Sequence, residues 1–394
     1  MKIKRYFFLM CMMLVTLTAC SKLQKNVEPP IDVTSQLPIA KMDTSLRPLL
    51  EEPRGAATNE GFYHIEETES GSFLSYIDFS SKTQVPLCAS PNCPHQDDTC
   101  TAFLSSMNGT AAVAEWNGKL YLIYLSQNGE GPGSVVEMNL DGSSRRTIHS
   151  FKSNDVFFLS NQLEDNDALY LNCFTVEETD RGELHNTPHT YVYHQGDKGA
   201  VETTAILQPG DTVLTTVNGK VLVSRSSVNV TELGNGVNGF VDENGTFTQW
   251  ESPYSNDWIQ CGFFDGCAYL LNKITYELIR YDMSSEEEFS YGNLPDDMNS
   301  YMLCTARDGN AILSGSTSDG KYVYCLATDT GIRQSQFSYY AHETLRSGLL
   351  DAAVGEDCYL IESKIGNPHN VFQIIPKKDY WNDLDTGKEI SLEW

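Results

Sequence analysis

The densest group of side chains that could do chemistry is Cys88, Cys93, His95 and Cys100, which lie within 13 residues of the chain. Their spacing is C-x4-C-x-H-x4-C. Protein-bound zinc takes four tetrahedral sulfur and nitrogen ligands, so this short loop could wrap around a single ion. Four protein ligands leave no position open for water, and we therefore expect any zinc here to be structural.

A disulfide between two of these cysteines, with the third left free, is the alternative. Export to an oxidising compartment would favour the disulfide. The odd number of thiols argues against a framework made of disulfides alone, but the spacing is not that of a standard zinc knuckle. Metal and disulfide both stay open, and in either case the loop would join the first two repeat units described below.

Other candidate residues point to structure more than to chemistry. His185, His189 and His194 surround Pro188 without helical spacing, so we expect a polar loop with incidental histidines. Cys261 and Cys267 flank a predicted hairpin and could pair across it. The sequence contains no nucleophile elbow, Walker loop, H-E-x-x-H or dinucleotide fingerprint.

The N-terminus has the order of a secretory signal peptide. Lys2, Lys4 and Arg5 precede an apolar run, and small residues then precede Cys20. The run is shorter than the ~20 residues that a spanning helix needs. The stretch Leu17-Thr18-Ala19-Cys20 resembles the lipobox of bacterial lipoproteins. That resemblance implies a signal peptide over 1–19, a lipid on Cys20, and a membrane-anchored protein that faces the outside, on the extracellular or periplasmic side.

Composition limits the partners. The chain has 53 acidic and 27 basic residues, a formal net charge of −26, so it should be repelled by nucleic acid. Residues 20–58 are rich in proline and poor in aromatic residues, and we expect a flexible tether there. The folded domain is then predicted to span 59–394.

The predicted domain contains a repeat. Seven stretches share a turn followed by an apolar strand: 59–64, 117–122, 165–171, 218–223, 265–270, 308–313 and 355–360. Asn-Gly and Asp-Gly between apolar runs are strong hairpin signals, and second hairpins follow over 135–142, 240–245 and 322–331. Units of four strands spaced by 43 to 58 residues are typical of a β-propeller. We predict an all-β fold with seven four-stranded blades, six or eight being the alternatives, in preference to two sandwich domains.

Two hairpins resemble known propeller repeats. Ala327–Gly331 is similar to the repeat of quinoprotein-type propellers, and Asn139–Ser143 to that of the periplasmic Tol-system propeller. Lipobox, tether and acidic propeller together resemble surface lipoproteins of Gram-positive anaerobes. The first blade lacks an obvious first strand, and the stretch Lys388–Trp394 could supply a strand that closes the ring.

These features predict a non-enzymatic binding or scaffolding module whose partner is an unknown protein or glycan. One alternative is a glycan-active or quinone-dependent enzyme with its site at the mouth of the central channel. Another, by analogy, is an envelope-assembly factor.

Overall fold

The computed structural model describes most of the chain after residue 45. The described residues are 46–50, 55–68, 71–88, 90, 92–95, 99–104, 111–124, 133–179, 182, 184–226, 236–295, 298–318, 320, 322–335, 351–354, 357–364, 371–384 and 386–392. All of them belong to one compact unit, Thr44–Trp394. Within these residues, no helix is both long enough and apolar enough to cross a membrane.

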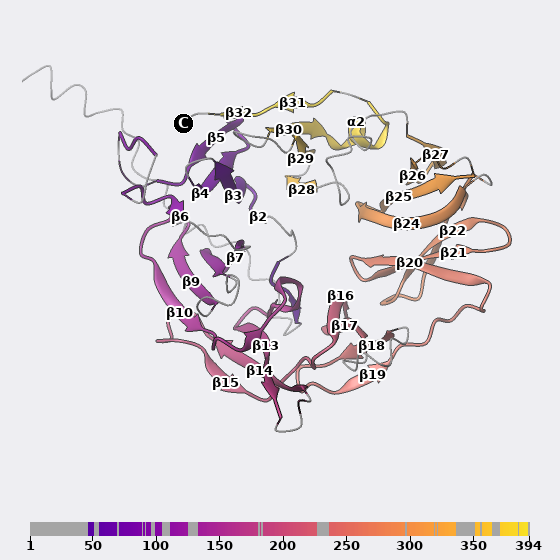
Figure 1. The fold of residues 1–394 in the computed structure, drawn as a ribbon. Coiled ribbons are helices and arrows are strands. Elements are labelled where there is room, and N and C mark those ends of the chain that lie inside the picture. The colour runs from indigo at the N-terminus through magenta and orange to yellow at the C-terminus, as the bar shows by residue number, and fades with distance from the viewer. Residues whose placement is uncertain are drawn as a thin grey trace, which may run out of the picture. The chain divides into compact units, whose positions relative to one another are not determined.

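Seven antiparallel sheets of four consecutive strands each make up the unit, so the predicted seven-bladed β-propeller is confirmed (Figure 1). Blade 1 has β2 (Gly55–Ala57), β3 (Gly61–Thr68), β4 (Gly71–Asp78) and β5 (Thr83–Pro86). Blade 2 has β7 (Ala111–Trp116), β8 (Lys119–Tyr124), β9 (Ser134–Asn139) and β10 (Arg146–Ser150). Blade 3 has β12 (Leu163–Glu164), β13 (Leu169–Glu178), β14 (Leu184–Tyr193) and β15 (Val201–Thr203).

The remaining blades follow in chain order. Blade 4 has β16 (Asp211–Val217), β17 (Lys220–Arg225), β18 (Val237–Val241) and β19 (Phe247–Gln249). Blade 5 has β20 (Trp258–Phe264), β21 (Cys267–Asn272), β22 (Glu277–Asp282) and β23 (Glu288–Asn293). Blade 6 has β24 (Met298–Arg307), β25 (Asn310–Thr317), β26 (Tyr322–Thr328) and β27 (Gly331–Gln334). Blade 7 has β28 (Asp351–Val354), β29 (Cys358–Lys364), β30 (Val371–Pro376) and β31 (Lys388–Glu389), with the short helix α2 (Lys377–Trp381) before β31.

Short elements extend some blades. In the sheet of blade 1, β6 (Phe103–Leu104) pairs with β4, and β32 (Ser391–Leu392) pairs with β5. In the sheet of blade 3, β1 (Arg47–Pro48) pairs with β12, and β11 (Asp155–Val156) pairs with β13. A single 3-10 turn, η1 (Leu159–Asn161), leads into β12.

The predicted turns join the first and second strands of the blades. In blade 2, Asn117 and Gly118 have φ values of 49° and 74°, the conformation of a type I′ hairpin turn. The turns at 218–219, 265–266 and 308–309 have the same pair of positive φ angles. Asparagine, aspartate and glycine tolerate this conformation best, which explains why the turns were visible in the sequence.

These turns also connect neighbouring blades. The Trp116 indole Nε1 donates to the Asp165 carbonyl at 2.7 Å, and the Asn117 side chain donates to the Asn166 carbonyl at 3.0 Å. The Gly266 amide donates to Thr215 Oγ1 at 2.9 Å. Turn residues therefore shape a hairpin and hold the inner ends of adjacent blades together.

The core lies mainly between blades. One cluster joins Trp116 and Tyr121 of blade 2 to Leu169, Leu171 and Tyr193 of blade 3. Another joins blade 5 to blade 6 in the same way. Because both faces of a blade are covered by its neighbours, the second strands β8, β17, β21 and β25 each contain an unbroken run of buried residues.

The C-terminal stretch does take part in ring closure, but in a different position from the one predicted. The missing first strand of blade 1 is β2, whose Gly55-Ala56-Ala57 is too short and too small to give a strand signal. Instead, β31 completes blade 7 and β32 then pairs in parallel with β5 at the outer edge of blade 1. Ile390 lies between these strands and packs with Phe62 and Leu360.

The segment predicted as a tether over 20–58 contains two strands, β1 and β2. Leu46 and Leu49 are 1% and 5% exposed, and the Leu49 amide donates to the Gln162 carbonyl at 2.8 Å. Proline content favoured a tether, but burial of these two leucines orders the short segment between them. The described fold thus begins before residue 59, the predicted boundary.

We expect Ile390→Ala to lower the free energy of unfolding by about 2–4 kcal/mol, because it removes buried methyl groups from the contact between the first and last blades. Urea denaturation measures this change. The exposed Leu384→Ala variant is the matched control and should change stability by less than about 0.5 kcal/mol. Equal stability of both variants would show that β31 and β32 do not hold the ring closed.

Candidate metal centre and channel cavities

The Cys3His cluster consists of Cys88, Cys93, His95 and Cys100. It lies in a loop that interrupts the outer edge of blade 1. On its outer edge, β4 pairs with β5 through residues 75–78 and with β6 through residues 72–73. Between them, Leu74 accepts a hydrogen bond from the Leu87 amide at 2.8 Å and donates one to the Ala102 carbonyl at 2.9 Å. Both backbone groups of one residue therefore fix the two ends of the loop.

The four predicted ligands come together in space. The sulfur atoms of Cys88, Cys93 and Cys100 and a ring nitrogen of His95 all lie within 4.8 Å of one another. Two sulfurs bound to one tetrahedral zinc are ~3.8 Å apart, given zinc–sulfur bonds of ~2.3 Å. The cluster could hold a metal ion with little movement of its side chains.

Hydrogen bonds around the sulfur atoms suit thiolate ligands. The Thr101 hydroxyl and the Ser90 amide donate to Cys88 Sγ at 3.3 and 3.4 Å, and the Ala102 amide donates to Cys100 Sγ at 3.4 Å. His95 Nδ1 lies 3.2 Å from Cys100 Sγ. Such outer partners orient metal ligands and favour their deprotonated form.

The thiols differ in acidity. Burial alone would raise the pKa of Cys88, but the hydrogen bonds from Thr101 and Ser90 outweigh it and lower this pKa to about 6. Burial, together with the neighbouring thiols of Cys93 and Cys88, raises the pKa of Cys100 to about 12. A metal ion would therefore displace a proton from Cys100 on binding, since the thiolate is the form that ligates.

The loop turns tightly and packs on the core of blade 1. Asn92 and His95 have φ values of 61° and 50°, in the left-handed region that asparagine and histidine adopt more readily than most other residues with a side chain. Beneath the cluster, the fully buried Phe73 packs against Cys100 and Ala102. The two turns and the packing of Cys100 on Phe73 together fix the loop against blade 1.

The disulfide alternative is not seen among the described residues. Cys88, Cys93 and Cys100 are all free thiols, and so are Cys261 and Cys267, for which a cross-hairpin bond was considered. Cys261 and Cys267 instead pack against the core cluster between blades 5 and 6. Cys20, the predicted lipidation site, lies outside the described residues.

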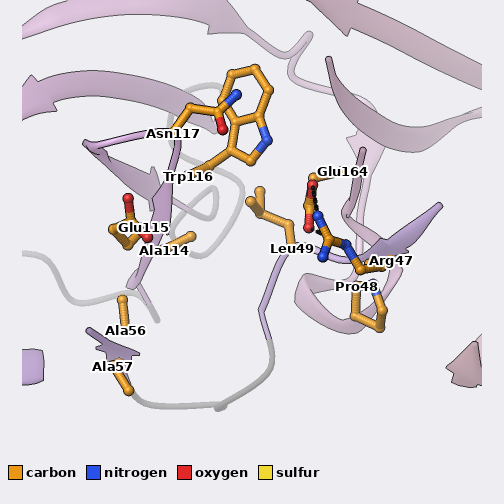
Figure 2. A pocket seen from close by; sticks show the side chains of 11 residues that line it. Arg47, Pro48, Leu49, Ala56, Ala57, Ala114, Glu115, Trp116, Asn117 and Glu164 are labelled. Atoms are coloured by element: carbon orange, nitrogen blue, oxygen red, sulfur yellow. Dashed lines mark hydrogen bonds and ion pairs between the residues drawn. The ribbon is translucent and has the colours of Figure 1, made fainter. Parts of the chain in front are cut away.

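The first of two cavities lined by inner strands has a volume of about 290 Å³. Its walls come from blades 1, 2 and 3 and from the segment around β1, and Figure 2 shows Arg47 and Glu164 on one side, facing Ala114, Glu115 and Ala56 on the other. Arg47 Nε is paired with Glu164 Oε1 at 2.9 Å. Glu115 Oε1 accepts a hydrogen bond from the Gly118 amide at 2.7 Å, while burial raises the pKa of Glu115.

A second cavity, of about 310 Å³, lies between the β1 segment and blades 4, 5 and 6. Leu50, Phe263 and Phe264 give it apolar walls. Charged groups of both signs also line it: Arg47, Arg307 and Asp265. Arg47 and Pro48 line both cavities. The β1 segment therefore separates two chambers in the middle of the described unit, a feature that no sequence signal indicated.

The histidine stretch is a strand, so the predicted polar loop is wrong. His185, Pro188 and His189 all belong to β14, which pairs with β13 over ten consecutive residues. His194 follows the end of this strand. Pro188 argued against a strand in the sequence, because proline has no amide hydrogen to donate. A strand tolerates proline at a position where no neighbouring strand needs that donor.

No model of a known protein family matches the chain, and no curated protein matches it. Among solved structures, the chain is similar to one from an analysis of two prolyl endopeptidases, with a TM-score of 0.46, 10% identity, and coverage of 88% of this chain and 50% of that chain. It is also similar to dipeptidyl peptidase 4 of Porphyromonas gingivalis, with a TM-score of 0.43, 8% identity, and coverage of 90% and 60%. The chain thus spans about half to three fifths of those proteins. Similarities this remote do not bear on its activity.

We expect the purified protein to retain one metal ion per chain and Cys93→Ser to lose it, because three donors bind less tightly than four. Elemental analysis by mass spectrometry measures the metal content. Cys358→Ser, which alters a half-buried cysteine in blade 7, is the matched control and should retain the ion. A metal-free wild type whose intact mass is about two units low would instead indicate a disulfide.

Proposed function

We propose that this protein is a membrane-anchored extracytoplasmic β-propeller lipoprotein that binds a small ligand between its inner strands. The observation that supports binding is the pair of cavities on either side of β1. Ligand pockets begin at about 300 Å³ and combine apolar walls with a few placed polar groups. At about 290 and 310 Å³, the two cavities lie at the lower end of this range. Leucine and alanine side chains line the first, and leucine and phenylalanine side chains line the second, in each case beside a few charged groups.

The chemistry of the walls favours a polar organic ligand such as a glycan unit. In the first cavity, carboxylates and a guanidinium lie beside Asn117, a set that can donate to and accept from hydroxyl groups. The carboxylates of Glu115 and Glu164 already have partners, the Gly118 amide and Arg47, which hold them in fixed orientations. Groups held in advance cost less entropy to organise when a ligand binds.

Membrane attachment rests on the leader and its cysteine. A lipid on Cys20 would anchor the mature chain, because acyl chains stabilise membrane binding by about 0.8 kcal/mol per buried methylene. The net charge of −26 would repel the protein from an anionic membrane surface, so attachment would depend on the lipid and not on electrostatic attraction.

The Cys3His loop is proposed to hold one structural zinc ion. Three sulfurs and one imidazole nitrogen are the donor set that zinc prefers, and the four donors are already grouped. Bound zinc would link residues 88 and 100, which lie near the two ends of the loop, and so stabilise the insertion at the edge of blade 1. Four protein ligands give it a structural and not a catalytic role.

Cys20→Ala is expected to abolish fatty-acid labelling and to move the protein from the membrane fraction to the soluble fraction. Metabolic labelling with a fatty-acid analogue, followed by fractionation, measures both. Cys11→Ala changes a cysteine of the same leader and should leave both unchanged. Labelling that persists in Cys20→Ala would contradict the lipoprotein assignment.

A glycan array probed with the full mature chain should identify ligands, and variants that fill the cavities should lose them. Ala57→Trp fills the first cavity and Thr216→Trp fills the second, so one of them should weaken binding at least tenfold in calorimetry. Gln249→Trp places the same side chain on the exposed outer strand of blade 4 and serves as the control.

The outcomes separate the candidate functions. A ligand whose affinity is unchanged in both cavity variants would place binding elsewhere on the propeller. A glycan that the protein cleaves would favour the enzyme alternative. The absence of any glycan, peptide or quinone ligand would count against the binding proposal itself.

A further inference from the structure

A chain of hydrogen bonds crosses four strands of blade 3 and is separate from both sites described above. Glu202 Oε1 on β15 lies 2.6 Å from His189 Nδ1 on β14. His189 Nε2 lies 2.9 Å from the Thr175 hydroxyl on β13. That hydroxyl also lies 2.7 Å from Asp155 Oδ1 on β11.

This series of hydrogen bonds runs from the interior of the protein to its surface. Asp155 and Thr175 are 7% and 5% exposed. The His189 side chain is 13% exposed and that of Glu202 is 54% exposed. Protons can therefore enter or leave at the Glu202 end, while the Asp155 end is shielded from water.

Counting protons shows what this arrangement requires. Three hydrogen bonds need three protons, one for each bond. The Thr175 hydroxyl supplies one and a neutral His189 ring supplies a second, whereas ionised Asp155 and Glu202 supply none. All three bonds form together only when one extra proton is bound, either on the ring or on Asp155. The site of that proton belongs to the coupled group and not to one residue.

The surrounding groups do not supply the extra proton at neutral pH. Cys173 lies opposite His189 in the sheet, and burial raises its pKa to about 12. Burial likewise raises the pKa of Tyr191 to about 12.

Two further groups approach from blade 2 and the turn that follows it. His149 on β10 packs against Tyr191 with ring centroids 4.1 Å apart and the rings tilted by 39°. Burial lowers the pKa of His149, which favours the neutral ring. The Lys152 amide donates to Asp155 Oδ2 at 2.8 Å and holds this carboxylate in place.

We propose that this network, named here the β15 clasp, fastens the outer edge strand of blade 3 only while it holds the extra proton. Val201, Glu202 and Thr203, the three residues of β15, are all exposed, and Glu202 reaches back across the sheet to His189. When the proton leaves, one bond must break. Water replaces it most readily at the exposed Glu202 end, so the contact that holds β15 is lost there.

The sign of the pH dependence follows directly. The stability that the clasp contributes is present while the proton is bound, and it is lost as pH rises through the release of that proton. The edge strand should therefore be held more firmly under mildly acidic conditions than under mildly alkaline ones.

The test is hydrogen exchange of the β15 amides in the full-length protein at pH 6 and pH 8, corrected for intrinsic exchange rates. The wild type should lose about tenfold in protection between the two, the factor expected for one charge-assisted hydrogen bond. His189→Gln keeps polar atoms but cannot titrate, so its protection should not change with pH. His185→Gln alters an exposed histidine of the same strand and should behave like the wild type.

Thr175→Val distinguishes the clasp from a simple ion pair. Without the hydroxyl, a neutral His189 ring can still donate to Glu202, so the extra proton is no longer needed and the pH dependence should vanish while protection stays high. Persistence of the full pH dependence in Thr175→Val would overturn the proposal. NMR of the His189 ring nitrogens and the Asp155 carboxyl carbon in the wild type provides a test free of folding defects, because a His189 ring with a single proton beside an ionised Asp155 at pH 6 would overturn it too.

Discussion

Every blade depends on its neighbours to cover its apolar faces. A single four-stranded sheet with two apolar faces cannot bury both, and the clusters between blades 2 and 3 and between blades 5 and 6 show how adjacent sheets do this in turn. Hydrogen bonds between the inner turns, such as those from Trp116 and Gly266, add to this packing. The arrangement is stable only as a closed set, because an opened ring would expose the faces of two blades to water.

Both candidate sites are additions to this scaffold. The Cys3His loop is inserted at the edge of blade 1 and is fixed at both ends by the backbone of Leu74. The cavities lie where inner strands face the β1 segment, whose position depends on the burial of Leu46 and Leu49. A rigid core with variable insertions is the arrangement that lets propellers take on different functions without change to the fold.

The seven-bladed fold could be predicted from the sequence because the hairpin turns need residues that tolerate positive φ, as at Asn117 and Gly118. It also indicated the metal cluster, since all four donors are close in the chain. It did not reveal β1, which is only two residues long, or the strand character of His189 next to Pro188. The cavities were also hidden, because they join residues from different blades. The β15 clasp was hidden although its strands are neighbours in one blade, because the residues that face each other depend on strand register, which alternation along a single strand does not reveal.

The pairing of β32 with β5 has a consequence for how the chain folds. Ser391 lies opposite Thr83, so the contact that joins the ends of the ring spans almost the whole described sequence. The entropic cost of closing so long a loop must be met before that contact contributes anything. A chain that emerges N-terminus first can form its hairpins one by one, but the first blade stays without its outermost strand until the last residues arrive. Until then, an unpaired edge is open to other chains, so the protein is most vulnerable to aggregation before β32 has paired with β5.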